Sequence, residues 1–188
     1  MTTAKILIVE DEAVIAMELS SSLLNLGHNV TASVDTGKEA IRKAEQEAPD
    51  LVIMDIRIKG EMDGISTAEQ IKNRFGIPVI FSTAYLDAER IERAKITMPF
   101  GYVLKPFQER DLKVVIEMAL YVAKVDAEKQ QINRKLQESE EKYRLAFTTS
   151  PDAVNINRLD GLYVDINEGF TRLTGFTRDD VIGKLSSD

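Results

Sequence analysis

A run of four apolar residues that ends in a carboxylate, Leu51-Val52-Ile53-Met54-Asp55, is the strongest constraint on the fold of this chain. A short, continuous apolar run bounded by turn residues is typical of a strand that is buried on both faces of a sheet. Pro49 precedes the run and Gly60 follows it closely. The pattern predicts a central strand with Asp55 at its carboxyl end, where open parallel sheets bind ligands. Taken alone, Asp55 could instead only cap the strand or start a turn.

Five strand-like segments alternate with helical segments over about the first 120 residues. The strand-like segments are residues 5–9, 30–34, 51–55, 78–83 and 101–105. Such alternation predicts a parallel sheet with helices on both faces, because right-handed crossovers place the helices there. We therefore expect an α/β, flavodoxin-like, doubly wound sheet of five parallel strands in the order 2-1-3-4-5.

The spacing of apolar residues predicts helices between these strands. We expect them from Ala13 to a stop at Gly27, from Gly37 to before Pro49, through residues 65–71 to a stop near Gly76, over residues 86–96, and from Asp111 onward. The single histidine, His28, lies in a Gly-His-Asn turn, where we expect it to be exposed. One histidine cannot build a multi-histidine metal site.

Polar side chains follow the carboxyl ends of four of the predicted strands. They are Glu10 and Asp11 after the first strand, Asp55 after the third, Thr83 after the fourth and Lys105 after the fifth. In the order 2-1-3-4-5 these four strands are contiguous, so the side chains should converge. Crowded carboxylates repel each other unless one takes up a proton or a cation binds. Hard oxygen ligands without Cys or His favour Mg²⁺.

This arrangement predicts phosphoryl transfer to a carboxylate. Asp55 would be the nucleophile and would form an aspartyl phosphate. Mg²⁺ would be held by Asp11, Asp55 and the backbone carbonyl of Arg57, and Glu10 would act through a metal-bound water. Lys105 would pair with phosphoryl oxygens, and the Thr83 hydroxyl would donate a hydrogen bond to one.

Each of these residues also has a simpler interpretation when it is considered alone. Glu10 and Asp11 could cap a helix, where acidic residues suit the positive end of the helix dipole. Thr83 could be a turn hydroxyl, and Lys105 could be a solvated residue at the end of a strand. The prediction of a site therefore rests on their joint placement at the same edge of the sheet.

Five segments of the chain resemble the response-regulator receiver domain. They are Val9-Glu10-Asp11-Glu12, Met54-Asp55-Ile56, Asp63-Gly64-Ile65, Ser82-Thr83-Ala84 and Tyr102-Val103-Leu104-Lys105-Pro106-Phe107. The resemblance implies that a histidine kinase or phosphotransfer protein donates a phosphoryl group to Asp55. It also implies that Thr83 and Tyr102 then change position and alter the output surface, and that the Lys105-Pro106 peptide is cis.

The loop after Asp55 departs from the common receiver pattern. Many receivers carry a proline four residues after the phosphoacceptor, where this chain has Lys59, and here the Asp63-Gly64 pair comes one residue later. This loop resembles that of receivers attached to multi-domain sensory proteins. The departure bears on which backbone carbonyl meets the metal.

A long helical segment follows the receiver-like region, since residues 122–142 contain neither Gly nor Pro. A heptad register fits this segment, with a at residues 115, 122, 129, 136 and 143 and d at residues 118, 125, 132, 139 and 146; eight of these ten residues are apolar. Leu112, Ile116 and Ala119 form a separate apolar face. One helix over residues 112–147 could thus pack on the sheet and form a homodimeric coiled coil. The alternative is a solvated helix or linker, and Lys129 and Ser139 weaken the register.

The last stretch contains the segments Tyr143-Arg144, Ser150-Pro151-Asp152-Ala153, Asp160-Gly161, Val164-Asp165-Ile166-Asn167 and Leu173-Thr174-Gly175-Phe176. In these segments it resembles the start of a PAS domain. Ser150-Pro151-Asp152 breaks the helix, two strand-like segments flank the turn dipeptide Asp160-Gly161, and a short helix is expected before Gly175. About 45 residues of this kind cannot bury a full core alone, so we expect either that the chain is a fragment of something longer or that this tail docks on a partner. We expect a receiver domain at residues 1–123, a coiled-coil signalling helix at 124–147 and a partial PAS domain at 148–188.

Composition excludes several classes of function. The chain has no Cys, which rules out disulfides, thiolate catalysis and Cys-ligated metals. Its net charge of −7 argues against broad binding to nucleic acid or to anionic membranes. No apolar run approaches the roughly 20 residues of a spanning helix, and the N-terminus lacks a signal-peptide core, so we expect a cytoplasmic protein without a membrane partner.

The sequence is best interpreted as a phosphorylation-controlled switch that acts on a dimeric helix and a PAS module. One alternative is the amino-terminal part of a longer, PAS-containing hybrid sensor histidine kinase. Another is a scaffold dimer that works without phosphate. No stand-alone enzyme is expected within these residues beyond phosphorylation of Asp55 from a phosphodonor.

Overall fold

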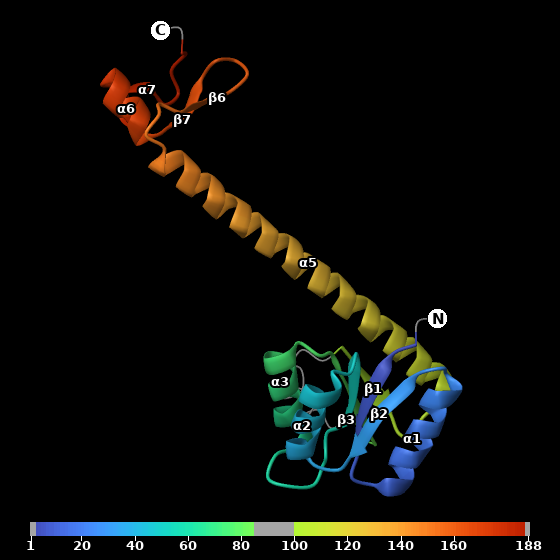
Figure 1. The fold of residues 1–188 in the computed structure, drawn as a ribbon. Coiled ribbons are helices and arrows are strands. Elements are labelled where there is room, and N and C mark those ends of the chain that lie inside the picture. The colour runs from blue at the N-terminus through green and yellow to red at the C-terminus, as the bar shows by residue number, and fades with distance from the viewer. Residues whose placement is uncertain (1–2, 85–99, 187–188) are drawn as a thin grey trace. The chain divides into compact units, whose positions relative to one another are not determined.

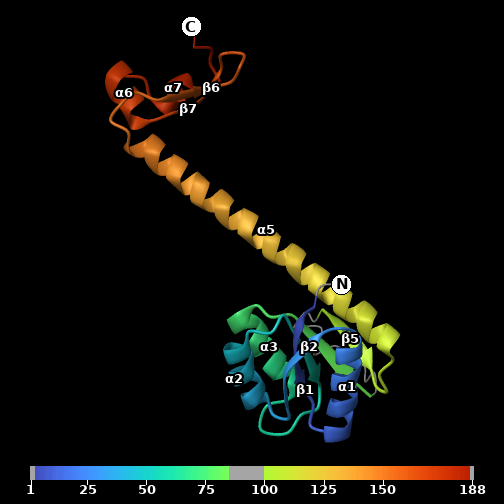
Figure 2. The same ribbon diagram turned by 45° about the vertical axis from the view of Figure 1, so that its right-hand side comes forward.

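The computed structural model describes residues 3–84 and 100–186, and the chain divides into two compact units, Met1–Ala127 and Glu128–Asp188. Most elements of both units are labelled in Figure 1, and β5 is labelled in Figure 2. The helix expected over residues 86–96 lies outside the described residues.

The first unit contains a five-stranded parallel sheet in the order β2-β1-β3-β4-β5, which confirms the predicted topology. The strands are β1 (Lys5–Val9), β2 (Asn29–Val34), β3 (Leu51–Asp55), β4 (Val79–Thr83) and β5 (Gly101–Leu104). Every residue of β3 and β4 is buried. The apolar run that ends in Asp55 is therefore an inner strand of the sheet, covered on both faces.

Three described helices and the start of a fourth belong to this unit: α1 (Ala13–Asn25), α2 (Gly37–Glu47), α3 (Gly64–Phe75) and α5 (Glu109–Thr149). Their boundaries follow local signals in the sequence. The Asp63 side chain caps α3 by accepting a hydrogen bond from the Ser66 amide, and Gly76 ends it in the left-handed conformation that glycine favours. The α5 helix begins at Glu109, two residues before the expected start.

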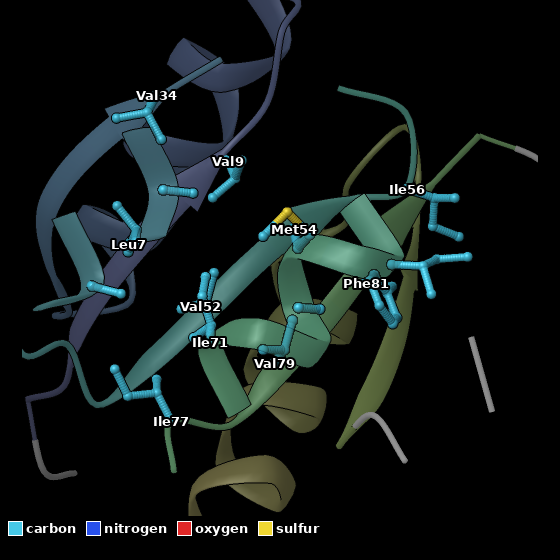
Figure 3. Packing of buried hydrophobic residues seen from close by; sticks show 14 residues of the cluster. Leu7, Val9, Val34, Val52, Met54, Ile56, Ile71, Ile77, Val79 and Phe81 are labelled. Carbon is cyan, nitrogen blue, oxygen red and sulfur yellow. The ribbon is translucent and has the colours of Figure 1, made fainter. Parts of the chain in front are cut away.

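Helices cover both faces of the sheet, as Figures 1 and 2 show for α2 and α3 on one face and α1 on the other. Residues of α2 and α3 pack with alternate strand residues that include Leu7, Val52, Met54 and Phe81, and Figure 3 shows this cluster. The second cluster joins α1 and α5 to the other alternate residues; its members include Ile8, Ile53, Ile80, Val103, Leu19 and Leu112. The two clusters are the two sides of the same strands, as the two-residue period of a strand requires.

His28 is buried, so the expectation of an exposed turn residue was wrong. Only 9% of its surface is accessible, and its Nδ1 atom accepts a hydrogen bond from the Ala4 amide at 3.3 Å. Gly27 adopts a φ of +83°, and the Ala4 carbonyl accepts a hydrogen bond from the Asn29 amide, so the turn lies against the start of β1. No local pattern in the sequence indicates this contact between residues far apart in the chain.

The burial of His28 predicts a loss of stability at mildly acidic pH. Burial lowers the pKa of His28 below its usual value of 6.5, and this effect exceeds the opposing charge of Glu117. The unfolded chain therefore binds this proton more readily than the folded protein. The stabilisation is fully present above pH 6.5 and is lost as the pH falls below it, through the lowered pKa of the folded state.

The His28→Asn variant is the matched control, because its amide oxygen can replace Nδ1 as the acceptor but does not titrate. We expect the thermal midpoint to fall more in the wild type than in His28→Asn between about pH 7.5 and pH 5.5. Calorimetric scans of both proteins measure this difference. Parallel curves would show that His28 does not contribute to the pH dependence.

The α5 helix presents two different faces in the first unit, as the sequence predicted. Leu112, Ile116 and Ala119 are buried against the sheet. The register residues Met118, Val122 and Val125 are 60%, 43% and 42% exposed. The first assigned a position differs, since Val115 packs against the sheet core. The exposed stripe therefore starts at Met118.

The second unit contains the rest of α5 and a small α+β arrangement. A two-stranded antiparallel sheet, β6 (Asn155–Asn157) and β7 (Tyr163–Ile166), is followed by α6 (Glu168–Thr174) and α7 (Arg178–Val181). Its cluster of buried apolar residues consists of Ile166, Phe170 and Val181. Asn167 is 4% exposed and accepts hydrogen bonds from the amides of Val154 and Phe170. A side-chain amide thus organises a unit whose apolar core is small.

Candidate functional site

Residues from four strands meet on one face of the sheet at its carboxyl edge. Glu10, Asp55, Ser82 and Lys105 each lie two residues beyond a member of the second core cluster, namely Ile8, Ile53, Ile80 and Val103. Side chains two residues apart on a strand point to the same face. The strand order then sets these four side chains side by side. Glu10, Asp55 and Lys105 were predicted from the sequence as members of the site.

Lys105 joins the two buried carboxylates. Its Nζ atom lies 2.6 Å from Oε2 of Glu10 and 2.5 Å from Oδ2 of Asp55. The side chains of Lys105, Glu10 and Asp55 are only 9%, 1% and 10% exposed. The Lys105 amide donates to the Thr83 carbonyl at 3.0 Å, and the Lys105-Pro106 peptide is cis, as the resemblance implied. Lys105 is therefore a counterion held inside the site.

The charges of this cluster shift the pKa values of its members. Burial alone would lower the pKa of Lys105, but its hydrogen bonds to Asp55 and Glu10 and their charges outweigh that effect and raise it. Burial raises the pKa of Glu10, the nearby charge of Asp55 adds to the rise, and Lys105 opposes it. The ammonium form of Lys105 is thus favoured at neutral pH, and Glu10 holds its negative charge less readily than an exposed glutamate.

Asp11 completes a group of carboxylates that fits a hard cation. Oxygen atoms of Glu10, Asp11 and Asp55 all lie within 4.8 Å of one another, and Asp11 is the most accessible of the three. Carboxylate oxygens at this spacing, without nitrogen or sulfur ligands, are the donor set that Mg²⁺ prefers. The geometry of the chain's own residues therefore fits the predicted metal.

The chain after Asp55 is held close to its carboxylate. The Arg57 amide donates to Oδ1 of Asp55 at 2.9 Å, while the Arg57 side chain is exposed. The Gly64 amide donates to the Ile56 carbonyl at 3.1 Å. A Cβ atom on Gly64 would lie 1.9 Å from the backbone oxygen of Asp55. Only glycine permits this approach, which sets the start of α3 directly against the strand end.

Lys59 is a second cation near the site, although no role in the site is predicted for it from the sequence. Its Nζ donates to the Asp11 carbonyl at 3.2 Å, and its amide donates to the Asp35 carbonyl at 3.1 Å. Lys59 and Thr36 form an isolated parallel bridge. The loop whose shape the sequence left open is therefore fixed by backbone pairing with the turn after β2. A groove of about 460 Å³ lined by Asp11, Lys59 and residues of α1 opens beside these groups.

Thr83 and Tyr102 belong to the opposite face of the sheet. Thr83 is 8% exposed and follows Phe81 by two residues on β4, so it shares that residue's face. Tyr102 lies beside Phe81, with ring centroids 6.0 Å apart. The structure thus brings Glu10, Asp11, Asp55 and Lys105 together, while Thr83 and Tyr102 share the sheet face that carries Phe81.

The family described as "Response regulator receiver domain" matches residues 6–117. The chain belongs to this family. Its receiver domain is 37% identical over 116 residues to the transcriptional regulatory protein PdtaR of Mycobacterium tuberculosis (strain CDC 1551 / Oshkosh), a match that covers 62% of this chain and 56% of that protein. It is also 37% identical over 118 residues to the phyllosphere-induced regulator PhyR of Methylorubrum extorquens, covering 62% and 43% of the two chains.

Solved structures agree with this assignment. The signal receiver domain of a modulated diguanylate cyclase from Desulfovibrio desulfuricans G20 is 38% identical, with a TM-score of 0.64, and the match covers 66% of this chain and 99% of that one. The N-terminal domain of a response regulator/sensory box/GGDEF 3-domain protein from Carboxydothermus hydrogenoformans is 34% identical, with a TM-score of 0.59, covering 65% and 98%.

Membership of the family carries general properties. A receiver domain of two-component signalling works with a phosphodonor partner such as a histidine kinase, and receivers generally bind Mg²⁺. The chain spans about half the length of the curated relatives it matches. Among the described residues, no helix is both long enough and apolar enough to cross a membrane.

Proposed function

We propose that this receiver domain accepts a phosphoryl group on Asp55 from a histidine kinase or a histidine phosphotransfer protein in a Mg²⁺-dependent reaction. The observation that carries the proposal is the position of the Asp55 carboxylate. It lies at the carboxyl end of an inner strand, bonded to the Lys105 ammonium and within 4.8 Å of two further carboxylates. Nucleophile, cation and metal-ligand candidates are thus already assembled.

The residues of the site have complementary roles in this reaction. An oxygen of Asp55 forms a bond to phosphorus as the bond from phosphorus to the donor nitrogen breaks. The Arg57 amide holds Oδ1 and the Lys105 ammonium contacts Oδ2, so the carboxylate is oriented before the donor arrives. Lys105 then offsets the charge of the transferred group. Glu10, Asp11, Asp55 and the Arg57 carbonyl would hold Mg²⁺, which would supply further neutralisation of phosphoryl charge.

The proposed switch connects this site to the opposite face of the sheet. Thr83 lies at the end of β4, and its Cα pairs with Leu104 on β5. Leu104 lies between Tyr102 and Lys105 in the chain. In the proposal the Thr83 hydroxyl moves to a phosphoryl oxygen, and Tyr102 moves with it. The close approach of Tyr102 to Phe81 supports a mechanical link along this face.

The proposed output is a change in a dimeric helix that leads to a PAS module. We assign residues 1–123 to the receiver, 124–147 to a coiled-coil signalling helix and 148–188 to the amino-terminal part of a PAS domain. The exposed apolar register on α5 supports the coiled coil. The hairpin and short helices of the second unit support the PAS assignment, as does the sensory box named for the similar three-domain protein.

Intact mass measured after incubation with acetyl phosphate and Mg²⁺ tests the proposed phosphorylation. We expect the wild type to gain the mass of one phosphoryl group and Asp55→Asn to gain none, because an amide lacks the nucleophilic oxygen charge. Chelation of Mg²⁺ should abolish the gain. A histidine phosphotransfer protein phosphorylated beforehand serves as a second donor.

Two results would contradict the proposal. A gain in Asp55→Asn equal to that of the wild type would place the acceptor elsewhere. Absence of a gain with both donors, in a protein that retains its fold by circular dichroism, would favour a scaffold that works without phosphate. The Glu47→Gln variant is the control for nonspecific effects of removing a carboxylate, because Glu47 ends α2 just before the start of β3, whereas Asp55 lies at the other end of that strand.

A further inference from the structure

The hydroxyl of Ser82 is buried beside Asp55 without a hydrogen-bond partner among the described residues. Ser82 is 1% exposed, and its Oγ atom makes no hydrogen bond there. Ser82 is paired with Asp55 in the ladder between β3 and β4, and with Val103 in the ladder between β4 and β5. All three residues point to the same face of the sheet, because paired positions on adjacent strands share a face.

The Lys105 side chain must pass over β4 on the same face as Ser82. Lys105 follows β5, and its ammonium contacts Asp55 at the end of β3, while β4 lies between these strands. Neighbouring strands are about 4.8 Å apart, so the side chain crosses roughly two strand spacings to reach Asp55. The Ser82 hydroxyl is therefore next to the path of the only ammonium that the described residues place between Glu10 and Asp55.

An unpartnered buried hydroxyl is unfavourable for the folded state. Buried polar groups are nearly always hydrogen-bonded. An alanine at this position would have no hydroxyl and would avoid the cost of a missing hydrogen bond. Lys105 is bonded to Glu10 and Asp55 in the state described here. Those carboxylates are also candidate metal ligands, so a cation bound to them competes with the ammonium. Lys105 then needs another acceptor.

We propose that Ser82 is a positioning residue for Lys105, whose ammonium it binds through its hydroxyl once the metal and the phosphoryl group occupy the oxygens of Glu10 and Asp55. The remaining N–H groups of Lys105 are then directed at the phosphoryl oxygens. This inference rests on the proposed phosphorylation of Asp55 and adds a residue to it. The competing explanation is that position 82 only needs a small side chain beside Lys105.

Beryllofluoride with Mg²⁺, used as a phosphoryl mimic, tests this role in the full chain. We expect Ser82→Ala to bind Mg²⁺ alone like the wild type but to bind beryllofluoride about tenfold more weakly, the effect of one lost hydrogen bond to a charged group. The melting midpoint of the ligand-free variant should rise by roughly 2–4 °C, because the unpartnered hydroxyl is gone.

A signal from Lys105 itself separates positioning from packing. In ¹⁵N-resolved spectra, the Lys105 ammonium protons of the wild type should exchange more slowly when beryllofluoride binds, and this slowing should be absent in Ser82→Ala. Lys105→Met identifies the signal. Ser82→Thr, which keeps the hydroxyl, should restore both the affinity and the slow exchange. If the extra methyl group prevents folding, Ser82→Cys, which keeps the size but is a weak acceptor, should behave like Ser82→Ala.

The outcomes distinguish this inference from the proposed function. The wild type and Ser82→Ala could have equal beryllofluoride affinity and equal proton exchange. That result would show that Ser82 acts only as a small packing residue, and it would not affect the proposed phosphorylation of Asp55. Failure of the wild type to bind beryllofluoride in the presence of Mg²⁺ would overturn both.

Discussion

Replacing Lys105 with methionine is expected to lower the free energy of unfolding of the metal-free receiver unit by about 3 kcal/mol. The variant keeps the apolar length of the side chain and removes the ammonium that contacts both Glu10 and Asp55. The carboxylates, 1% and 10% exposed, then lose their counterion while they remain largely shielded from water. Saturating Mg²⁺ should recover most of the loss, because it replaces the missing positive charge.

Hydrogen exchange of the β1 and β3 amides measures this change within the receiver unit, even if the two units of the chain unfold separately. Lys59→Met is the matched control. It removes a cation from the same edge of the sheet, but the Lys59 side chain is 60% exposed, so we expect a change below about 1 kcal/mol. Identical protection in Lys105→Met and the wild type without Mg²⁺ would show that the carboxylates do not depend on Lys105.

Replacing both Ile132 and Leu136 with aspartate is expected to convert the proposed dimer to monomers. These residues are 66% and 56% exposed on α5 and occupy adjacent d and a positions of the register. In a parallel dimer the change removes four apolar side chains from the interface and adds four like charges. The loss of apolar burial alone amounts to about 6 kcal/mol or more of association free energy.

Light scattering at micromolar concentration measures the mass of the wild type and of this variant. The double variant Gln130→Asp and Gln137→Asp is the control, since both residues occupy b positions on the outer face of the same helix. It should remain dimeric. A dimer that persists after the Ile132 and Leu136 changes would place the interface on another surface, and a monomeric wild type would favour the solvated helix.

The inner strands and their order could be predicted because their signals are local. A strand covered on both faces is apolar at every position, as residues 51–54 are, and the short spacing between elements leaves few topologies. Once the order is known, the meeting of Glu10, Asp55 and Lys105 follows from strand ends alone. The same reasoning separated the two faces of α5. The exposed register, however, begins at the d position Met118 and not at the a position Val115, because Val115 packs against the sheet core.

The remaining features depend on contacts that no local pattern records. His28 is buried because the turn returns to Ala4, and Lys59 reaches Asp11 because its loop pairs with the turn after β2. Ser82 is an exception, because the alternation of β4 alone places it: it follows Ile80 by two residues and shares that residue's face.

The internal ammonium also imposes an order of events on the site. Three carboxyl groups outnumber the two lysines, Lys105 and Lys59, at this edge of the sheet, so we expect a phosphodonor, itself an anion, to meet net repulsion until a further cation arrives. We therefore expect occupancy by metal to come before reaction with the donor. Because Lys105 already neutralises part of the cluster, a metal would have to displace a resident charge, which would weaken its binding and keep it reversible. Under the proposed function, the domain would then respond only when both inputs coincide, so that neither the metal nor the donor would set the switch alone.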